Sequence, residues 1–302
     1  MSESFKSGFI AVVGRANAGK STLVNAFVGQ KISIVSPKPQ TTRENILGIW
    51  TDETCQMIFV DTPGALNPKT LLGDFMVRSI EQAVVDVDCI LLVIDGHDGI
   101  KQADFDLIDK YGKADAPLVV AVTKTDISQP EKMMAELAKL NKYDCIREIF
   151  AVSARRNRGV EELKTHLKNY LNDDRVYFDE DYVTDRPQRF LVCEEIREKT
   201  LLCLNEEVPH GIGISLNKMT FNEEEDRWEI DADIIVEKAS HKSIVLGKKG
   251  RMIKSIGMAA RESIQKMLEA RVRLDLWVRV KEDWRNSERI LNEIGYNKKD
   301  LD

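Results

Sequence analysis

The chain has 302 residues, of which 43% are hydrophobic and 31% charged, and its formal net charge is −6 at pH 7. This length and composition are typical of a water-soluble protein with two domains, and the acidic balance argues against nucleic-acid binding over the whole surface. The sequence has no apolar run of eighteen residues, no basic-then-apolar leader and no zinc-ligand spacing, so we expect neither a membrane span, a secretory signal nor a zinc site.

The first predicted element is a buried strand at 9–13, followed at once by a glycine-rich turn and a helix at 20–28. The turn matches G-x-x-x-x-G-K-[ST], a spacing that lets backbone N–H groups surround phosphate oxygens at a helix N-terminus. In this pattern the lysine contacts the β- and γ-phosphates and the serine hydroxyl binds Mg²⁺. The predicted nucleotide-binding residues of this segment are Gly14, Arg15, Ala16, Asn17, Ala18, Gly19, Lys20, Ser21 and Thr22.

Strands and helices then alternate along the chain. Further strands are expected at 47–51, 56–60, 89–94, 118–123 and 148–152, and helices at 70–85, 102–111, 131–141 and 159–171. This order predicts an α/β domain of the P-loop NTPase type over 1–172, with a mostly parallel sheet and helices on both faces. The short turn Asp52-Glu53 predicts an antiparallel hairpin within that sheet. A ligand is expected at the carboxyl ends of the strands.

Asp61-Thr62-Pro63-Gly64 directly follows the strand at 56–60. An aspartate in this place can hold Mg²⁺ through water, and the N–H of the glycine can face a γ-phosphate. Such a tetrapeptide alone is usually only a turn. Its position one strand after a phosphate loop favours a role in nucleotide binding for all four residues.

Thr123-Lys124-Thr125-Asp126 comes at the end of the strand at 118–123. The carboxylate of Asp126 can accept hydrogen bonds from N1–H and the 2-amino group of guanine, which adenine lacks, and the stem of Lys124 can cover the base. The alternative is a solvated loop in which the aspartate caps a helix. Ser153-Ala154 after the next strand can complete the base pocket, with the N–H of Ala154 facing guanine O6. Together these loops predict guanine rather than adenine nucleotides.

The four loops resemble the motifs of GTPases. The resemblance implies that Gln40-Thr41-Thr42-Arg43 is the first switch, whose Thr42, in preference to Thr41, closes on Mg²⁺ and the γ-phosphate. It implies GTP, GDP and Mg²⁺ as ligands. The residues implied to bind Mg²⁺ are Ser21, Thr42 and Asp61, and those implied to act in hydrolysis are Lys20, Thr42 and Gly64.

Some positions depart from the usual GTPase pattern. Ala65 stands where many GTPases have a water-orienting glutamine, so we expect slow intrinsic hydrolysis. Relatives usually carry proline at Ala16 and asparagine at Thr123; without that amide we expect lower GTP affinity, with selectivity kept through Asp126. Asn17 resembles an asparagine that helps bind K⁺ in several relatives. Our hypothesis is that K⁺ replaces an arginine finger, and the alternative is a local hydrogen bond within the loop.

Residues 173–189 are charged, non-periodic and contain Pro187, which predicts a linker. The remainder, 190–302, predicts a second domain of the α+β class. Its expected elements are a helix at 190–205, antiparallel strands at 211–221 and 228–237, a helix after 250, a strand at 272–280 and a final helix at 284–294.

The stretch from Lys238 to Arg261 holds seven lysines and arginines and no acidic residue, which predicts a local cationic face for a nucleic-acid backbone. Within it lies Gly247-Lys248-Lys249-Gly250, flanked by apolar residues and followed by a helix. A G-x-x-G tetrapeptide alone carries little weight, and the alternative is a solvated basic turn, but this context resembles a KH domain of type II. In that fold the loop contacts the backbone of about four unpaired nucleotides. The residues implied to bind RNA are Lys242, Gly247, Lys248, Lys249, Gly250, Arg251 and Lys254.

A GTPase domain followed by one KH domain of type II, together with the segments 181–190 and 276–281, resembles the Era family of ribosome-assembly GTPases over essentially the whole chain. The resemblance implies binding of 16S ribosomal RNA near its 3′ end and a role in maturation of the small (30S) subunit. It also implies a cytoplasmic monomer with peripheral contact to the cytoplasmic membrane and no DNA partner. Two other interpretations stay open: an RNA chaperone in which the nucleotide is chiefly structural, and a membrane-associated regulatory GTPase, which lacks a lipidation motif.

Overall fold

The computed structural model of the protein describes residues 5–65, 68–205 and 208–296. The chain forms two compact units. The second unit comprises Arg186 onward together with two short segments, Ser36–Thr41 and Pro68–Phe75, and the first comprises the rest of the chain up to Asp185.

Within the described residues, the first unit contains a six-stranded sheet with the strand order β2-β3-β1-β4-β5-β6. Its strands are β1 (Lys6–Gly14), β2 (Ile46–Thr51), β3 (Cys55–Asp61), β4 (Cys89–Asp95), β5 (Leu118–Thr123) and β6 (Ile146–Ala151). All neighbours are parallel except β2 and β3, which form the predicted antiparallel hairpin with Ile49 opposite Ile58. The predicted α/β fold with a mostly parallel sheet is confirmed.

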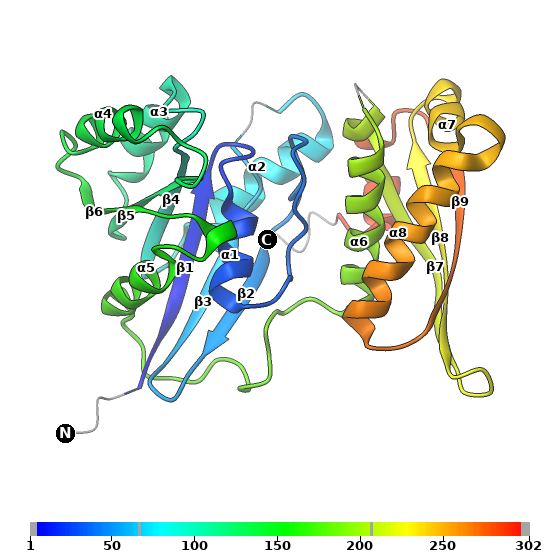
Figure 1. Ribbon diagram of the computed structural model, residues 1–302, viewed down its shortest axis with the longest axis horizontal. Coiled ribbons are helices and arrows are strands. Elements are labelled where there is room, and N and C mark those ends of the chain that lie inside the picture. The colour runs from blue at the N-terminus through cyan, green and yellow to red at the C-terminus, as the bar shows by residue number, and fades with distance from the viewer. Residues whose placement is uncertain (1–4, 66–67, 206–207, 297–302) are drawn as a thin grey trace. The chain divides into compact units, whose positions relative to one another are not determined.

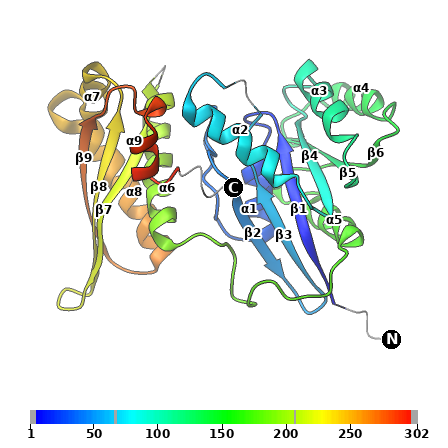
Figure 2. The same ribbon diagram turned by 180° about the vertical axis from the view of Figure 1, so that it is seen from behind.

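Helices cover both faces of this sheet. Their bounds are α1 (Lys20–Val28), α2 (Leu71–Ala83), α3 (Gln102–Tyr111), α4 (Pro130–Leu140) and α5 (Val160–Leu167). Figure 1 shows α1 and α5 in front of the sheet, and Figure 2 shows α2 on the opposite face. Every residue of β3, β4 and β5 is buried, because a strand between two helical layers has no solvent-facing side. The phosphate loop and the other predicted loops are therefore attached to the ends of a well-packed sheet.

Residues 173–185, which the sequence predicts to be linker, pack against the first unit. The buried side-chain amide of Gln56 donates a hydrogen bond of 2.8 Å to the carbonyl oxygen of Phe178. The N–H of Ile49 donates to the carbonyl oxygen of Val183 at 2.9 Å. The second bond occupies the outer side of the edge strand β2, and the first comes from a side chain of β3. The sequence pattern does not reveal this packing, because it relies on the backbone of a charged segment.

The second unit contains a three-stranded sheet with the order β7-β8-β9. Its elements are α6 (Gln188–Cys203), β7 (Gly213–Asn222), β8 (Arg227–Val236), α7 (Ala239–Leu246), α8 (Arg251–Leu268), β9 (Val272–Val280) and α9 (Glu288–Glu293). β7 and β8 are antiparallel, whereas β8 and β9 are parallel. α6 and α8 lie on one face of the sheet (Figure 1) and share a core with its inward-facing residues Ile230, Ala232 and Ile234. The predicted α+β domain is confirmed, and α7 is a short helix that the sequence analysis does not predict.

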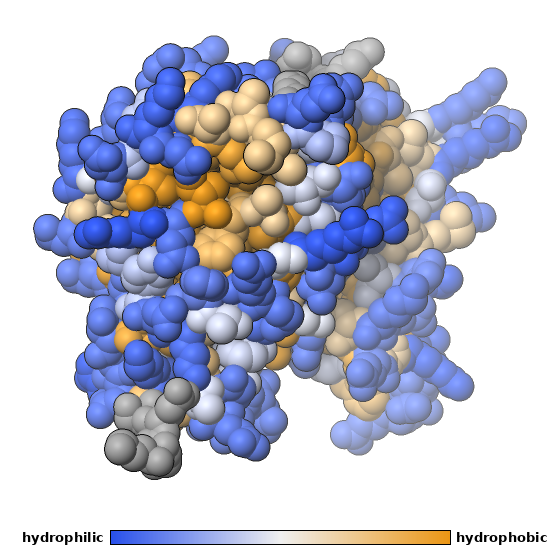
Figure 3. All heavy atoms as spheres, turned by 60° about the vertical axis from the view of Figure 1, so that its left-hand side comes forward, coloured by the Kyte–Doolittle hydropathy of each residue, from blue (hydrophilic) through white to orange (hydrophobic). Residues whose placement is uncertain are grey.

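Figure 3 shows the side of the first unit that carries α3 and α4; it is mainly hydrophilic, with an apolar area in its upper half. No helix in the described part of the chain is long and apolar enough to cross a membrane. Nor do residues 5–65, 68–205 and 208–296 contain a cluster of three or more His, Cys, Asp or Glu side chains that could hold a metal ion.

Candidate nucleotide site and nucleic-acid groove

The phosphate loop, Gly14–Ser21, connects β1 to α1 and depends on its glycines. Gly14 has φ 150°, and a Cβ atom there would lie 2.4 Å from the carbonyl oxygen of Val93 on β4. Gly19 has φ 99° and is the residue before α1, which has no side-chain cap. The first N–H groups of α1 are thus available to an anion, as a phosphate site requires.

Lys20 is 6% exposed, and its ammonium group donates to the carbonyl oxygens of Gly14 at 3.1 Å and Arg15 at 2.9 Å. Burial lowers the pKa of Lys20 to about 8, with Asp61 opposing the shift and Arg15 adding to it. The loop therefore curls around its own lysine. A polyanion bound in the loop favours the charged form of this lysine.

The residues expected to bind Mg²⁺ come together in the structure. The hydroxyl oxygens of Ser21 and Thr42 are 2.9 Å apart. Asp61 is fully buried, and neither of its carboxylate oxygens has a hydrogen-bond partner among the described residues. Burial raises the pKa of Asp61, opposed in part by the nearby hydroxyl of Ser21, the ammonium of Lys20 and the hydroxyl of Ser33. A buried carboxylate without a hydrogen-bond donor, beside two hydroxyls, fits a divalent cation.

Thr41 points elsewhere: its hydroxyl donates to the carbonyl oxygen of Lys38 at 2.7 Å. Gly64 packs directly against the phosphate loop, since a Cβ atom there would lie 2.6 Å from Cα of Ala16. The N–H of Ala65 donates to the carbonyl oxygen of Gly14 at 3.0 Å. The segment after β3 is therefore attached to the phosphate loop through its backbone. The side chain of Thr62 donates to β1 rather than facing this site.

The base-recognition loops follow β5 and β6. The hydroxyl of Ser153 donates to Oδ1 of Asp126 at 2.7 Å, and this hydrogen bond is the chief reason why the pKa of Asp126 is lowered. Asp126 is exposed and so accessible to a bound base. Ala154 begins a short 3₁₀ helix, η1 (Ala154–Arg156), directly beside this pair. The structure thus brings together the residues expected to read guanine.

Lys124 is held by a carboxylate that the sequence analysis did not single out. Its ammonium group lies 2.5 Å from Oδ2 of Asp95, the last residue of β4. Burial by itself raises the pKa of Asp95, but hydrogen bonds from Lys124 and from two backbone N–H groups outweigh it and lower the pKa. A carboxylate at the carboxyl end of a strand in the nucleotide sheet is the signal that could have found Asp95.

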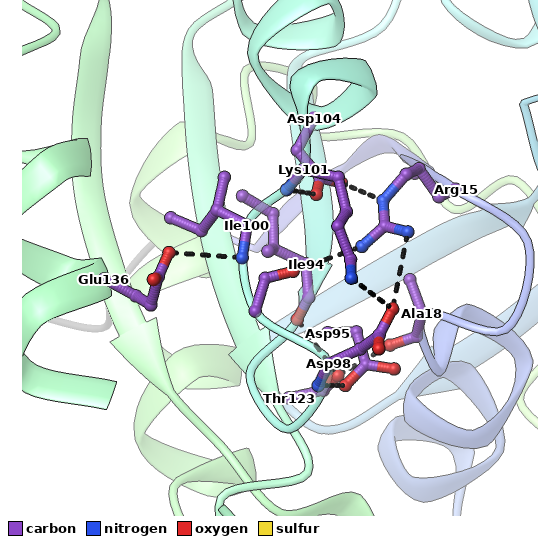
Figure 4. Close-up of polar contacts among 12 residues, drawn as sticks. Arg15, Ala18, Ile94, Asp95, Asp98, Ile100, Lys101, Asp104, Thr123 and Glu136 are labelled. Carbon is purple, nitrogen blue, oxygen red and sulfur yellow. Dashed lines mark hydrogen bonds and ion pairs between the residues drawn. The ribbon is translucent and has the colours of Figure 1, made fainter. Parts of the chain in front are cut away.

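Thr123 connects the base loop to the phosphate loop. Its hydroxyl donates to the carbonyl oxygen of Ala18 at 2.6 Å, and the carbonyl oxygen of Ile94 lies 3.1 Å away (Figure 4). From the sequence we expect Thr123 to leave the pocket without a brace. The structure shows that the threonine hydroxyl forms a brace of its own, whereas the lower GTP affinity stays a prediction.

Figure 4 shows a second attachment of the phosphate loop. The guanidinium of Arg15 points toward α3, where its Nε donates to Asp104 at 2.7 Å. Asp104 is fully buried, and its other oxygen accepts from the N–H of Lys101 at the start of α3. Arg15 therefore helps position the loop through its side chain, and Asp104 is a further positioning residue that sequence reasoning missed.

In the second unit, the turn Gly247–Gly250 depends on glycine at both ends. Gly247 has φ 68°, and a Cβ atom there would lie 2.7 Å from Cβ of Met252. Gly250 has φ 73° with open space around it. Lys248 and Lys249 between them are exposed. Among the described residues, none of the seven cations between Lys238 and Arg261 has an ion-pair partner. The turn therefore presents charge close to the backbone.

A groove of about 280 Å³ runs beside this turn, between α8 and β9. Its lining consists of apolar residues, two cations, one acidic residue and a glycine: Ile253, Lys254, Gly257, Met258, Arg261, Leu274, Asp275 and Leu276. Met258 is 52% exposed, which is unusual for a large apolar side chain and leaves it available to a planar ligand. Sequence reasoning predicted Lys254 but missed the groove itself, because Gly257, Met258 and the two leucines lie on separate elements.

The fold and the two sites define a class of protein: a P-loop GTPase domain followed by a KH domain. Residues 9–124 match the family model described as 50S ribosome-binding GTPase, and residues 207–285 match the KH domain model. The chain is 41% identical over 296 residues to GTPase Era of Clostridioides difficile strain 630, covering 98% of this chain and 100% of that protein. It is 43% identical over 293 residues to GTPase Era of Clostridium tetani, covering 97% and 99%. The chain belongs to the Era family of GTPases.

Two solved structures are similar over the full length. One is Era in complex with MgGDPNP and nucleotides 1506–1542 of 16S ribosomal RNA, with 35% identity, a TM-score of 0.93, and coverage of 97% of this chain and 99% of that chain. The other is a variant of Aquifex aeolicus Era bound to GDP·AlF₄⁻, with the same identity and TM-score and coverage of 97% and 100%. Both units of the present chain therefore have counterparts in proteins of known structure.

Proposed function

We propose that the protein is a GTP-hydrolysing switch that binds 16S ribosomal RNA near its 3′ end through its KH domain and assists assembly of the small (30S) ribosomal subunit. The observation that carries the nucleotide half is the meeting of Ser21, Thr42 and Asp61 at the carboxyl edge of the sheet, where the Asp126–Ser153 pair also lies. Family membership supports both halves and a cytoplasmic location. A monomer, no DNA partner and peripheral membrane contact stay predictions.

In the nucleotide site, Lys20 and the N–H groups at the start of α1 bind the phosphates. Ser21, Thr42 and Asp61 hold Mg²⁺, and the unpartnered carboxylate of Asp61 supports this role. Thr42 is favoured over Thr41, whose hydroxyl donates to the carbonyl oxygen of Lys38. Bound Mg²⁺ neutralises charge that develops on the phosphate oxygens during phosphoryl transfer.

Recognition of guanine falls to Asp126, whose carboxylate is oriented by Ser153. The N–H of Ala154 serves guanine O6, and the stem of Lys124, anchored by Asp95, covers the base. Adenine lacks both donors for Asp126, so binding ATP leaves this carboxylate desolvated with only the hydrogen bond from Ser153. The site therefore selects GTP and GDP.

Hydrolysis is slow without a further group, because the methyl group of Ala65 cannot orient water. The N–H of Gly64 stabilises the γ-phosphate, and Lys20 and Thr42 position it. We include K⁺ bound near Asn17 in this proposal as the cation that replaces an arginine finger. Asn17 adopts a left-handed backbone conformation within the loop, with φ 62°.

RNA binding is assigned to the Gly247–Gly250 turn and to the groove beside it. Lys248 and Lys249 neutralise phosphates, while unstacked bases lie on the apolar wall formed by Met258 and Leu276. Lys242, Arg251 and Lys254 add to the same cationic face. The apolar surface can contact bases and the cations can contact phosphates. This combination favours single-stranded RNA over a ligand that offers only negative charge.

Gly257 offers a sharp test of this groove. A Cβ atom there meets only Cδ1 of Leu276, at 3.7 Å, so Gly257→Ala should fold and bind RNA like the wild type. Gly257→Leu extends further into the groove and should weaken binding of the 1506–1542 RNA by at least tenfold while leaving GTP affinity unchanged. Equal RNA affinity of the two variants would mean that bases do not occupy the groove.

Lys248→Asp with Lys249→Asp should abolish RNA binding and leave GTP binding intact, as measured by fluorescence anisotropy and calorimetry. Loss of both activities would contradict the separation of the two sites. One alternative function is favoured by Ala65: an RNA chaperone in which the nucleotide is chiefly structural. Equal RNA affinity with GTP, with GDP and without nucleotide would favour that alternative, since a ligand shifts states only through differential affinity.

A further inference from the structure

A second cationic surface lies on the first unit, at the loop that follows β6. Arg155, Arg156 and Arg158 lie within four consecutive residues and are all exposed. Among the described residues none of the three forms an ion pair. The stretch from Ser153 to Val160 contains no acidic residue. Two acids follow it at the start of α5, where Glu161 is paired with Lys164 and Glu162 is exposed. In a chain with a net charge of −6, this arginine loop is a marked local excess of positive charge.

The arginine loop, defined as Ser153–Arg158, is closed by its own backbone. The N–H of Ser153 donates to the carbonyl oxygen of Arg158 at 2.9 Å, and the N–H of Arg158 donates back at 3.0 Å. The N–H of Arg156 also lies 3.3 Å from the hydroxyl of Ser153. Asn157 takes the left-handed conformation, with φ 49°, that closes the turn. The three guanidinium groups thus project from a backbone that is already ordered, which reduces the entropy lost on binding.

Bound GTP does not provide anions for these arginines. In the proposed site its phosphates lie at the phosphate loop, and its base and ribose, which lie beside Ala154, carry no charge. Asp126 is the carboxylate whose pKa Arg155 and Arg156 help to lower, and it is already hydrogen-bonded to Ser153. One carboxylate does not balance three exposed arginines, so positive charge remains in excess at this loop.

We propose that the arginine loop is a second RNA-contacting surface, which binds the phosphate backbone of ribosomal RNA independently of the KH groove. This inference rests on the proposed RNA-binding function and extends it to the first unit. Arginine suits the role because its planar guanidinium can hold two oxygens of one phosphate. The loop reads no bases, so it positions the RNA and the KH groove selects it.

The test uses the full-length protein with all three arginines changed to glutamine. The matched control carries Lys110→Gln, Lys113→Gln and Arg147→Gln, three exposed cations of the same unit, so both variants lose the same charge. Affinity for naked 16S ribosomal RNA is measured between 50 and 200 mM KCl. Each phosphate contact contributes about 0.7 to the slope of log affinity against log salt, so the arginine variant should lose about 2 from this slope. The wild-type affinity should then fall about 20-fold more than that of the variant over this range.

Several results would overturn the inference. Equal slopes for the arginine variant and the control would show that the arginine loop does not contact RNA. Unchanged affinity for naked RNA combined with weaker binding to intact 30S subunits, or to vesicles containing anionic lipid, would assign the loop to a protein or a membrane. A change in GTP affinity of the arginine variant would assign it to the nucleotide site. No RNA binding by the wild type would instead refute the proposed function itself.

Discussion

Thr123 provides a test of how the base loop and the phosphate loop are connected. Thr123→Val removes the hydroxyl while keeping a branched side chain of similar size. The residue is 2% exposed, and its hydroxyl donates to the carbonyl oxygen of Ala18 at 2.6 Å. The substitution therefore leaves a carbonyl of the phosphate loop without this donor in a buried place.

A buried acceptor that loses its partner costs about 1–3 kcal/mol. Each 1.4 kcal/mol corresponds to a tenfold change in affinity, so Thr123→Val should raise the Kd for GTP by about five- to 150-fold if the loss falls on the nucleotide-binding conformation. Calorimetric titration gives this Kd, and thermal unfolding without nucleotide reports how much of the loss falls on the fold instead.

Thr123→Ser is the matched control, because it keeps the hydroxyl and removes only a methyl group. Its GTP affinity should stay within about threefold of the wild type, which is the range of a small packing change. If the valine variant binds GTP as tightly as the serine variant, the Thr123–Ala18 hydrogen bond does not position the phosphate loop.

Three other predictions concern the nucleotide site. Burial lowers the pKa of Lys20 to about 8, and bound phosphates favour its charged form. The protein should therefore take up about half a proton per GTP at pH 8, and the Kd for GTP should rise about fourfold from pH 7 to 8.5. Calorimetry in buffers of different ionisation enthalpy checks this, and a Kd that does not change with pH would contradict it. Asp126→Asn should shift preference from GTP toward xanthosine triphosphate, because the amide suits the other base edge, and unchanged selectivity in competition binding would contradict the pocket. GTP turnover should be faster in KCl than in NaCl, with Asn17→Ala removing the difference; equal rates for the wild type would eliminate the K⁺ hypothesis.

Much of the fold follows from local patterns. The β-branched run before Gly14 and the alternating residues of β9 each predict a strand directly. A strand buried on both faces is apolar throughout, and a strand buried on one face alternates. The GTPase loops were predictable for the same reason: parallel strands end at a common edge, so motifs after successive strands meet there. The short helix α7 and the packing of 173–185 were not predictable, since neither has an apolar period of its own.

Parts of the site needed the structure. From the sequence, Thr123 only replaces an asparagine and so lacks its amide. In the structure, the Thr123 hydroxyl donates a hydrogen bond to the phosphate loop. Asp104 is 89 residues from Arg15 in the chain, and no local pattern links them. The groove combines Met258 on α8 with Leu276 on β9, which come together only when the helix packs on the sheet.

The amino-acid sequence by itself determined that this protein binds a guanine nucleotide and carries a KH turn, because those functions require particular residue types at short, fixed spacings. The tertiary structure alone decided which side chains hold those loops in place and where the groove between α8 and β9 forms. Such contacts join residues far apart in the chain, and their distances depend on how complete helices and strands pack rather than on any local pattern.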